Sequence, residues 1–215
     1  MATYCISDIH GEYDRYIKML ETINFTDDDF LYILGDAIDR GPDSIAVITD
    51  IMSRKNVQML LGNHEQMCLD TLGLRPVFGA RQLWQSNGGT KTRSRLLYVC
   101  TPPQRGNILR FMASLPEYAE VNINGRQFYL VHGYPGADSH SRLWGRPEKD
   151  SLPPLENKTA VIGHTPTSLI TGDSENPLKI WHSNGVICID CGCGHKTENR
   201  RLACLRLEDM AEFYV

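Results

Sequence analysis

Two short segments near the start of the sequence combine carboxylate, imidazole and guanidinium groups. The motif DIHG at residues 8–11 provides Asp8 and His10, and the motif GDAIDRG at residues 35–41 provides two aspartates and an arginine. Carboxylates and imidazoles bind divalent cations, and an imidazole also transfers protons near neutral pH. Each motif has a simpler reading, because Asp8 could fix the tautomer of a structural His10 and segment 35–41 could be a solvated loop. Neither motif alone separates the two readings.

Both motifs directly follow apolar runs of strand length. The runs Thr3–Ser7 and Phe30–Leu34 have the composition of buried strands, and a third run, Val57–Leu61, precedes the motif GNHE at residues 62–65. Segments with helically spaced apolar residues lie between them. This βαβ order predicts parallel strands whose carboxyl ends meet at one edge of a sheet. Because open α/β sheets bind ligands at that edge, we expect the motifs to converge on one crevice.

Two further histidines follow predicted strands in the second half of the chain. His132 comes after the run Arg126–Val131, and His164 comes after the run Thr159–Ile162. The dipeptide Asn124-Gly125 predicts a tight hairpin, because both residues tolerate a positive φ angle. An antiparallel or mixed sheet is therefore expected in this half. The apolar run Leu178–Trp181 is expected to form one of its strands.

Five predicted strand ends thus carry polar side chains suited to one site. A set of Asp, Asn and His without Cys suits hard or borderline divalent ions such as Mn, Fe or Zn. Asp36 is central in the series and is the natural bridge between two ions. Two ions about 3.5 to 4 Å apart can bind a phosphoryl group and convert a water molecule into the nucleophile. A core histidine remains an alternative for His64. The candidate residues are Asp8, His10, Asp36, Asp39, Asn63, His64, His132 and His164.

The ordered motifs resemble the signature of the calcineurin-like metallophosphoesterases. They read SDIHG (7–11), GDAIDRG (35–41), GNHE (62–65), HG (132–133) and GH (163–164), and residues 187–194 resemble the terminal strand of that group. The nearest form is the compact bacterial and bacteriophage type of the phosphoprotein phosphatase branch. This resemblance implies an α/β fold in which two mixed β-sheets form a central sandwich flanked by helices.

The resemblance also implies a role for each matched residue. His64 would be the general acid that protonates the leaving oxygen, oriented by Asp39. Arg40 and Arg146 would clamp the phosphate, and Asn63 and His64 would also contact the substrate. Asp8, His10 and Asp36 would hold one metal, and Asp36, Asn63, His132 and His164 would hold the second.

These roles predict a metal-dependent phosphomonoesterase acting on phosphoserine and phosphothreonine in proteins, with phosphotyrosine as a further candidate substrate. Two divalent ions, manganese first and iron or zinc as alternatives, are the expected cofactors. One alternative is a hydrolase of dinucleoside polyphosphates such as Ap4A, because a similar bacterial branch carries the same ligands. Another is a non-catalytic, metal-dependent binding module. Tyr134 stands where a second glycine is usual, which weakens the case for a protein substrate.

Bulk composition restricts the partners. The net charge of -4 provides no basic surface for nucleic acid or for an anionic membrane. A phosphorylated protein or a small phosphoester is the expected substrate. No apolar run reaches the roughly 20 residues of a membrane span, and a cytoplasmic location is the default expectation. The seven cysteines are odd in number and scattered, which favours free thiols over a disulfide framework.

We expect one domain over residues 1–215, with a mainly helical insertion at about residues 73–115. The arginines and lysines of the insertion could favour an anionic substrate, but a solvated helical face is the preferred explanation. His182 could approach the site or serve in a turn. The segment from Cys191 to His195 superficially resembles a zinc motif, but its Cys-x-Cys spacing fits a tight strand exit better.

Overall fold

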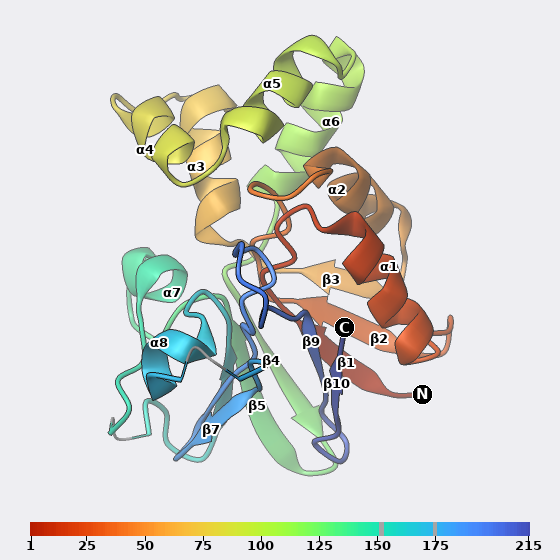
Figure 1. The fold of residues 1–215 in the computed structure, drawn as a ribbon, viewed down its shortest axis with the longest axis vertical. Coiled ribbons are helices and arrows are strands. Elements are labelled where there is room, and N and C mark those ends of the chain that lie inside the picture. Colours follow the sequence, from red (N-terminus) through yellow and green to blue (C-terminus); the bar gives the residue numbers. More distant parts are fainter. Residues whose placement is uncertain (151–152, 174–175) are drawn as a thin grey trace.

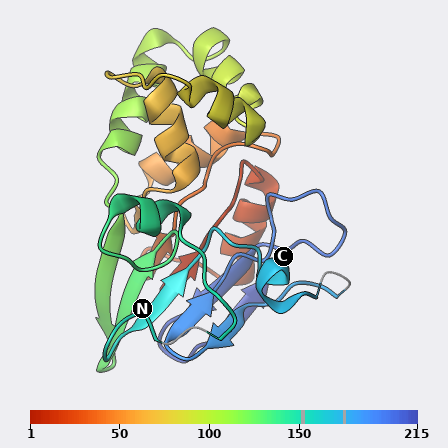
Figure 2. The ribbon, with the colours of Figure 1, turned by 90° about the vertical axis from the view of Figure 1, so that its left-hand side faces the viewer.

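The computed structural model describes residues 1–150, 153–173 and 176–215. Two β-sheets form the lower part of the molecule in Figure 1, and a group of helices forms the upper part. Figure 2 shows the same division from the side.

The first sheet places the amino-terminal strands next to strands from the end of the chain. It contains β1 (Thr3–Ile6), β2 (Phe30–Ile33), β3 (Val57–Met59), β9 (Ala203–Arg206) and β10 (Glu212–Tyr214), in the order β10-β9-β1-β2-β3. The strands β1, β2 and β3 run parallel, whereas β9 pairs antiparallel with β1. The prediction of parallel βαβ strands is therefore confirmed.

The second sheet is mixed, as expected. It contains β4 (Tyr118–Ile123), β5 (Arg126–Val131), β6 (Thr159–Ile162), β7 (Trp181–Ser183) and β8 (Val186–Cys188), in the order β4-β5-β6-β8-β7. The strands β5, β6 and β8 are parallel, and β4 and β7 run antiparallel at the edges. Asn124 and Gly125 have φ angles of 52° and 84°, which is the hairpin geometry that their dipeptide predicts.

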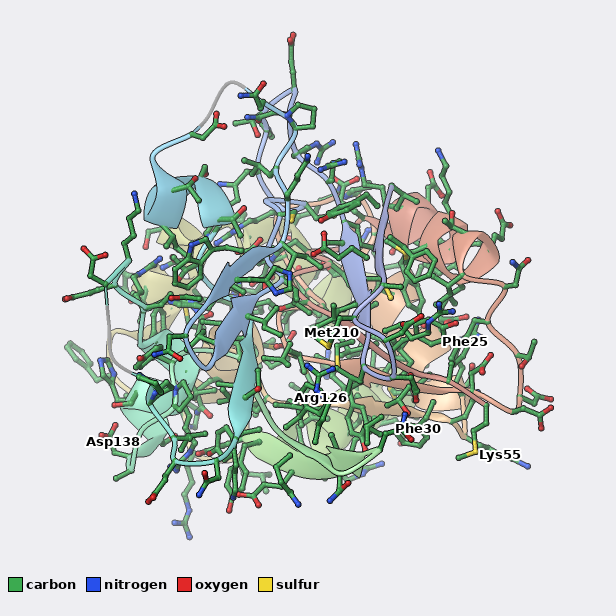
Figure 3. The ribbon with its side chains drawn as sticks, turned by 90° about the horizontal axis from the view of Figure 1, so that it is seen from below. Phe25, Phe30, Lys55, Arg126, Asp138 and Met210 are labelled. Carbon is green, nitrogen blue, oxygen red and sulfur yellow. The ribbon has the colours of Figure 1, made fainter. Side chains whose placement is uncertain are left out.

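Alternation along the strands separates three apolar layers. Cys5 and Leu205 of the first sheet pack with Phe128 and Val161 of the second, so the sheets form a sandwich. Ile6 points the other way, into a layer shared with the helices. Figure 3 shows the molecule from below, at the end away from the upper helices of Figure 1, where Met210 follows β9 and Arg126 begins β5. The predicted fold class of two mixed sheets flanked by helices is confirmed.

Most of the helices share the apolar layer that contains Ile6 of the first sheet, whereas the last helix packs against the second sheet. The helices are α1 (Tyr13–Thr22), α2 (Ser44–Ser53), α3 (Asn63–Leu72), α4 (Ala80–Ser86), α5 (Thr90–Tyr98) and α6 (Pro102–Ala113), followed by the short helices α7 (Ser139–Trp144) and α8 (Thr167–Thr171). Residues 73–115 contain α4, α5 and α6. None of the described helices is both long and apolar enough to cross a membrane.

One expected strand differs from the prediction. The apolar run 178–181 contributes only Trp181 to β7, which continues to Ser183. Leu178 and Ile180 are buried, but their backbone amides donate to the Asn199 carbonyl oxygen and the Tyr214 hydroxyl instead of joining a strand ladder. An apolar run shows that a segment is buried, not where its backbone finds partners.

Candidate active site

The turns that follow the strands share an unusual backbone. Non-glycine residues with positive φ angles are uncommon, and such conformations gather at functional sites because surrounding contacts must enforce them. Asp39 and Arg40, with φ angles of 76° and 61°, are consecutive. The predicted site residues in this conformation are Asp8, His10, Asp36, Asp39, Arg40 and His164.

Asp36 lies at the centre of the cluster. Its Oδ2 atom is 3.6 Å from Nε2 of His10 and 3.8 Å from Nε2 of His64, and its Oδ1 atom is 3.4 Å from Nε2 of His132. Among the described residues, two sets of side chains bring their ligand atoms within 4.8 Å of one another: His10, Asp36 and His64, and Asp36, His132 and His164. Because Asp36 belongs to both sets, it has the position expected of a bridging ligand.

The histidine tautomers direct lone pairs into the centre of the cluster. Nδ1 of His10 is 2.9 Å from the Ile38 carbonyl oxygen, and Nδ1 of His132 is 2.7 Å from that of Leu34. A carbonyl only accepts, so both Nδ1 atoms carry protons and both Nε2 atoms present lone pairs to Asp36. The nitrogen lone pairs and the carboxylate oxygens repel each other unless a cation lies between them. These residues therefore fit divalent cations.

Two more predicted ligands lie beside these sets. Asp8 places Oδ1 at 3.8 Å from Nε2 of His10. Asn63 places Oδ1 at 2.9 Å from Nε2 of His132 and 3.1 Å from Nδ1 of His164. The Nε2 atom of His164 is buried and has no hydrogen-bond partner. The structure thus brings all six predicted metal ligands together.

Burial keeps the imidazoles in the form that metal binding requires. Burial, together with the smaller effects of the neighbouring His132 and Arg146, lowers the pKa of His164 to about 2. Burial also lowers the pKa of His10 and His132 below the ordinary value. Neutral imidazole is the state that coordinates a metal.

The side chain of His64 connects two neighbours. Its Nδ1 atom lies 2.6 Å from Oδ2 of Asp39, and its Nε2 atom lies 3.1 Å from Nη2 of Arg40. An arginine only donates, so Nε2 of His64 accepts and the ring proton sits on Nδ1, facing Asp39. His64 and Asp39 are both buried, whereas Arg40 is exposed at the mouth of the site.

Arg146 lies at the margin of the cluster. It is exposed, it follows α7, and its Nη1 atom is 3.5 Å from the hydroxyl oxygen of Thr165, the residue after His164. It is therefore close enough to reach a ligand held by His164. His182 lies elsewhere, because its Nε2 atom is 2.7 Å from Oε1 of Glu212 on β10.

Sequence reasoning missed three residues that support the site. The buried carboxylate of Glu65 accepts backbone hydrogen bonds from the turn after β2 and from Gly62. Nε1 of Trp84 donates to Asp39, and Nε2 of His195 is 3.3 Å from Nη1 of Arg40. Glu65 had a signal, because it stands three residues after Gly62, the spacing of a capping residue. Nothing in the sequence near Trp84 or His195 indicates these contacts.

The Glu65 carboxylate holds the backbone of the turn that carries Asp36. Its Oε2 atom accepts from the amides of Asp36 (2.9 Å) and Gly62 (3.1 Å), and its Oε1 atom accepts from Ala37 (3.0 Å) and Ile38 (3.3 Å). Burial raises the pKa of Glu65 to about 7, although the backbone donors oppose this shift. Gly62 must be glycine, because a Cβ atom there would lie 2.3 Å from Oδ1 of Asp36.

The sequence pattern of the calcineurin-like phosphoesterases matches residues 1–207. The chain belongs to the calcineurin-like phosphoesterase family. Within this family, the similarity to curated relatives covers only part of each chain. The chain is 34% identical over 134 residues to a symmetrical bis(5'-nucleosyl)-tetraphosphatase of Acidovorax sp. strain JS42, a match covering 61% of this chain and 43% of that protein. It is 46% identical over 118 residues to the Salmonella paratyphi B protein of the same name, covering 54% and 38%. The matches therefore span less than half the length of these curated relatives.

A solved structure shows how far the family fold extends. A protein serine/threonine phosphatase from Saccharomyces cerevisiae superimposes with a TM-score of 0.64 at 12% identity, covering 96% of this chain and 72% of that one. At this identity the likeness shows the fold alone.

The comparisons correct one prediction. The primary prediction of a serine/threonine protein phosphatase is wrong, because the curated relatives at 34% and 46% identity are tetraphosphatases of dinucleosides. The catalytic motifs are common to both activities, so they could not separate the substrates. Their outer neighbours, such as Tyr134 after His132-Gly133, differed from the phosphatase pattern and pointed away from it.

Proposed function

We propose that the chain is a metal-dependent hydrolase of dinucleoside polyphosphates of the Ap4A type, cleaving them symmetrically. The observation that carries this proposal is the 46% identity over 118 residues to a symmetrical bis(5'-nucleosyl)-tetraphosphatase. The site supports phosphoester hydrolysis in general, through its metal-ligand cluster and its Asp39–His64 pair. Membership of the phosphoprotein phosphatase branch and the extent of a single domain over 1–215 stay predictions.

We assign the metal ligands as the sequence predicts them. Asp8, His10 and Asp36 would hold one ion, and Asp36, Asn63, His132 and His164 the other, with manganese as the first candidate. When bound, two such ions would neutralise phosphate charge and activate a water molecule for attack on phosphorus. Although Nε2 of His64 also faces Asp36, we assign His64 to proton transfer because its Nδ1 proton is already held by Asp39.

The remaining residues bind the substrate and transfer its proton. Arg40 and Arg146 are exposed beside the cluster, where their guanidinium groups would bind phosphate oxygens in pairs. Arg40 must then turn from His64 toward the phosphate. This movement exposes the Nε2 lone pair of His64, which takes up a proton from solvent and then passes it to the leaving oxygen, while Asp39 continues to accept from Nδ1. Asn63 and His64 would line the phosphate position.

The test compares substrates with the purified, manganese-loaded protein. We expect Ap4A to be hydrolysed to two molecules of ADP, resolved by ion-exchange chromatography, and to be turned over faster than a phosphoserine peptide. The Asp36→Asn variant, which loses the shared ligand, serves as the inactive control. Faster turnover of the phosphopeptide, or products other than ADP, would refute the proposed substrate. If no phosphoester is cleaved while two ions bind, the chain is a binding module.

A further inference from the structure

The insertion touches the catalytic turn at three points. Nε1 of Trp84, in α4, is 2.6 Å from Oδ2 of Asp39. The amide of Arg40 donates to the carbonyl oxygen of Gly88 at 3.3 Å. The hydroxyl of Thr92, in α5, is 2.9 Å from that of Ser44, which accepts from the amide of Asp39. Residues 84–92 of the insertion therefore support Asp39 and Arg40, the two consecutive residues with positive φ angles.

The contact between Trp84 and Asp39 is the most specific of the three. Trp84 and Asp39 are both 0% exposed. Two donors, the indole N–H of Trp84 and the Nδ1–H of His64, converge on Oδ2 of Asp39, and Oδ1 of Asp39 is buried without a partner. The Asp39 carboxylate therefore has one orientation in which both donors are satisfied.

The neighbouring backbone fixes the indole in place. A Cβ atom on Gly89 would lie 2.2 Å from Nε1 of Trp84, so the ring is packed directly on this glycine. A buried tryptophan usually finds an acceptor for its N–H group, and mere satisfaction of that group is the simplest alternative. The identity of the acceptor favours a positioning role as well, because Asp39 is the residue that holds His64.

We propose that Trp84 is a positioning residue for proton transfer. Its indole N–H holds the Asp39 carboxylate so that His64 keeps its proton on Nδ1 and directs Nε2 toward the leaving group. The insertion thereby aligns the acid as well as covering the site. The inference rests on the proposed phosphoester hydrolysis for its catalytic consequence, and on geometry alone for the coupling of Trp84 to His64.

The coupling is tested on the metal-free protein by NMR. Phe keeps an aromatic ring but removes the N–H donor together with part of the indole, so Trp84→Phe is compared with a second tryptophan-to-phenylalanine variant. We expect the ring nitrogen shifts of His64 to move from a pure Nδ1–H tautomer toward a mixture of tautomers. Trp181→Phe removes an indole on β7 and is the matched control, with His64 unchanged. Conversely, Asp39→Asn should move the indole N–H signal of Trp84 but not those of Trp144 and Trp181. Unchanged His64 shifts in a folded Trp84→Phe variant would overturn the proposal.

The catalytic consequence is tested with two aryl phosphates. Phenoxide needs a proton as it leaves, whereas 4-nitrophenoxide does not. Trp84→Phe should lower kcat for phenyl phosphate roughly 10-fold, a part of the 10²- to 10⁴-fold that a general acid contributes, with KM unchanged. It should leave kcat for 4-nitrophenyl phosphate within about twofold, because that reaction does not use the acid. Gly89→Ala, which pushes the indole away, should reproduce this pattern.

The outcomes separate the two proposals. Equal losses on both aryl phosphates would reduce Trp84 to a structural role and overturn the inference. If the unaltered protein cleaves neither aryl phosphate nor Ap4A, the proposed function fails, and the His64 signals still decide whether Trp84 positions it.

Discussion

Nη2 of Arg40 lies 3.1 Å from Nε2 of His64 and donates to it. The same histidine faces Asp39 through Nδ1 at 2.6 Å, so both ring nitrogens are engaged before any substrate is bound. The ring is therefore in its neutral Nδ1–H form, and its outward nitrogen is available only after Arg40 has turned away. An anionic phosphate would attract the Arg40 guanidinium away from His64. Substrate binding would thereby make Nε2 of His64 available for proton transfer.

Replacing His64 separates proton transfer from metal binding. We expect His64→Asn to lower kcat by roughly 10²- to 10⁴-fold, the usual share of a positioned acid. Metal content, measured by plasma mass spectrometry, should stay the same, because we assign no metal to this ring. Loss of an ion would show instead that His64 is a ligand of the set that it shares with His10 and Asp36.

Replacing Asn63 should affect one ion only. Its Oδ1 atom faces His132 and His164, the two histidines that we assign to the second ion. We expect Asn63→Ala to lower the metal content from two ions to about one per chain, since a site loses affinity with each ligand removed. His182→Ala is the control, because His182 pairs with Glu212 away from the site, and it should retain both ions. Two tightly bound ions in the Asn63 variant would contradict the assignment.

Replacing Glu65 should destabilise the turn that carries Asp36. A glutamine has one acceptor oxygen, so the backbone N–H groups facing its amide nitrogen would lose their partners, at about 1 to 3 kcal/mol each. We expect Glu65→Gln to lower the free energy of unfolding of the metal-free protein by about 3 kcal/mol, as measured by urea denaturation. Glu198→Gln makes the same chemical change at an exposed position and should stay within about 0.5 kcal/mol. Equal stability of the two variants would mean that Glu65 does not hold the turn.

Asp43 provides a pH-dependent prediction at the start of α2. Its Oδ1 atom accepts from the amide of Ala46 at 3.0 Å and lies 2.6 Å from Nη1 of Arg95 in the insertion. Partial burial acts to raise its pKa, but the hydrogen bond from Ala46 and the contact with Arg95 hold the pKa below the ordinary value. The unfolded chain therefore takes up this proton at a higher pH than the folded chain. The stabilisation is complete above the unfolded pKa of about 3.9 and is lost as the pH falls through the lower, folded value.

Two variants test this dependence. Asp43→Ala should cost about 1 kcal/mol near pH 7, the usual value of a helix cap, and the difference from the unaltered protein should shrink below about pH 4. Asp43→Asn keeps the cap without the charge, so its stability relative to Asp43→Ala should not change with pH. Urea denaturation across this range measures both. A constant cost of the alanine variant down to about pH 3 would rule out the role of the charge.

Local sequence was sufficient for the residues at the strand ends. A few residues at most separate each of these side chains from the end of a strand formed by an apolar run, so the edge of the sheets could be predicted to collect them: Asp8, Asp36, Asn63, His132 and His164. Where a run was buried without strand pairing, as at Leu178 and Ile180, the same reasoning failed. The substrate could not be predicted either, because the motifs are shared by enzymes that act on different phosphoesters.

The sequence by itself determined which chemical groups this protein brings to the end of each strand, because a strand and the turn after it are encoded by neighbouring residues. Only the tertiary structure decided what holds those groups in register. Trp84 is 45 residues from Asp39, and His195 is 155 residues from Arg40. Such contacts have no local period or spacing, and they exist only because the insertion and the segment after β8 fold back over the same strand ends.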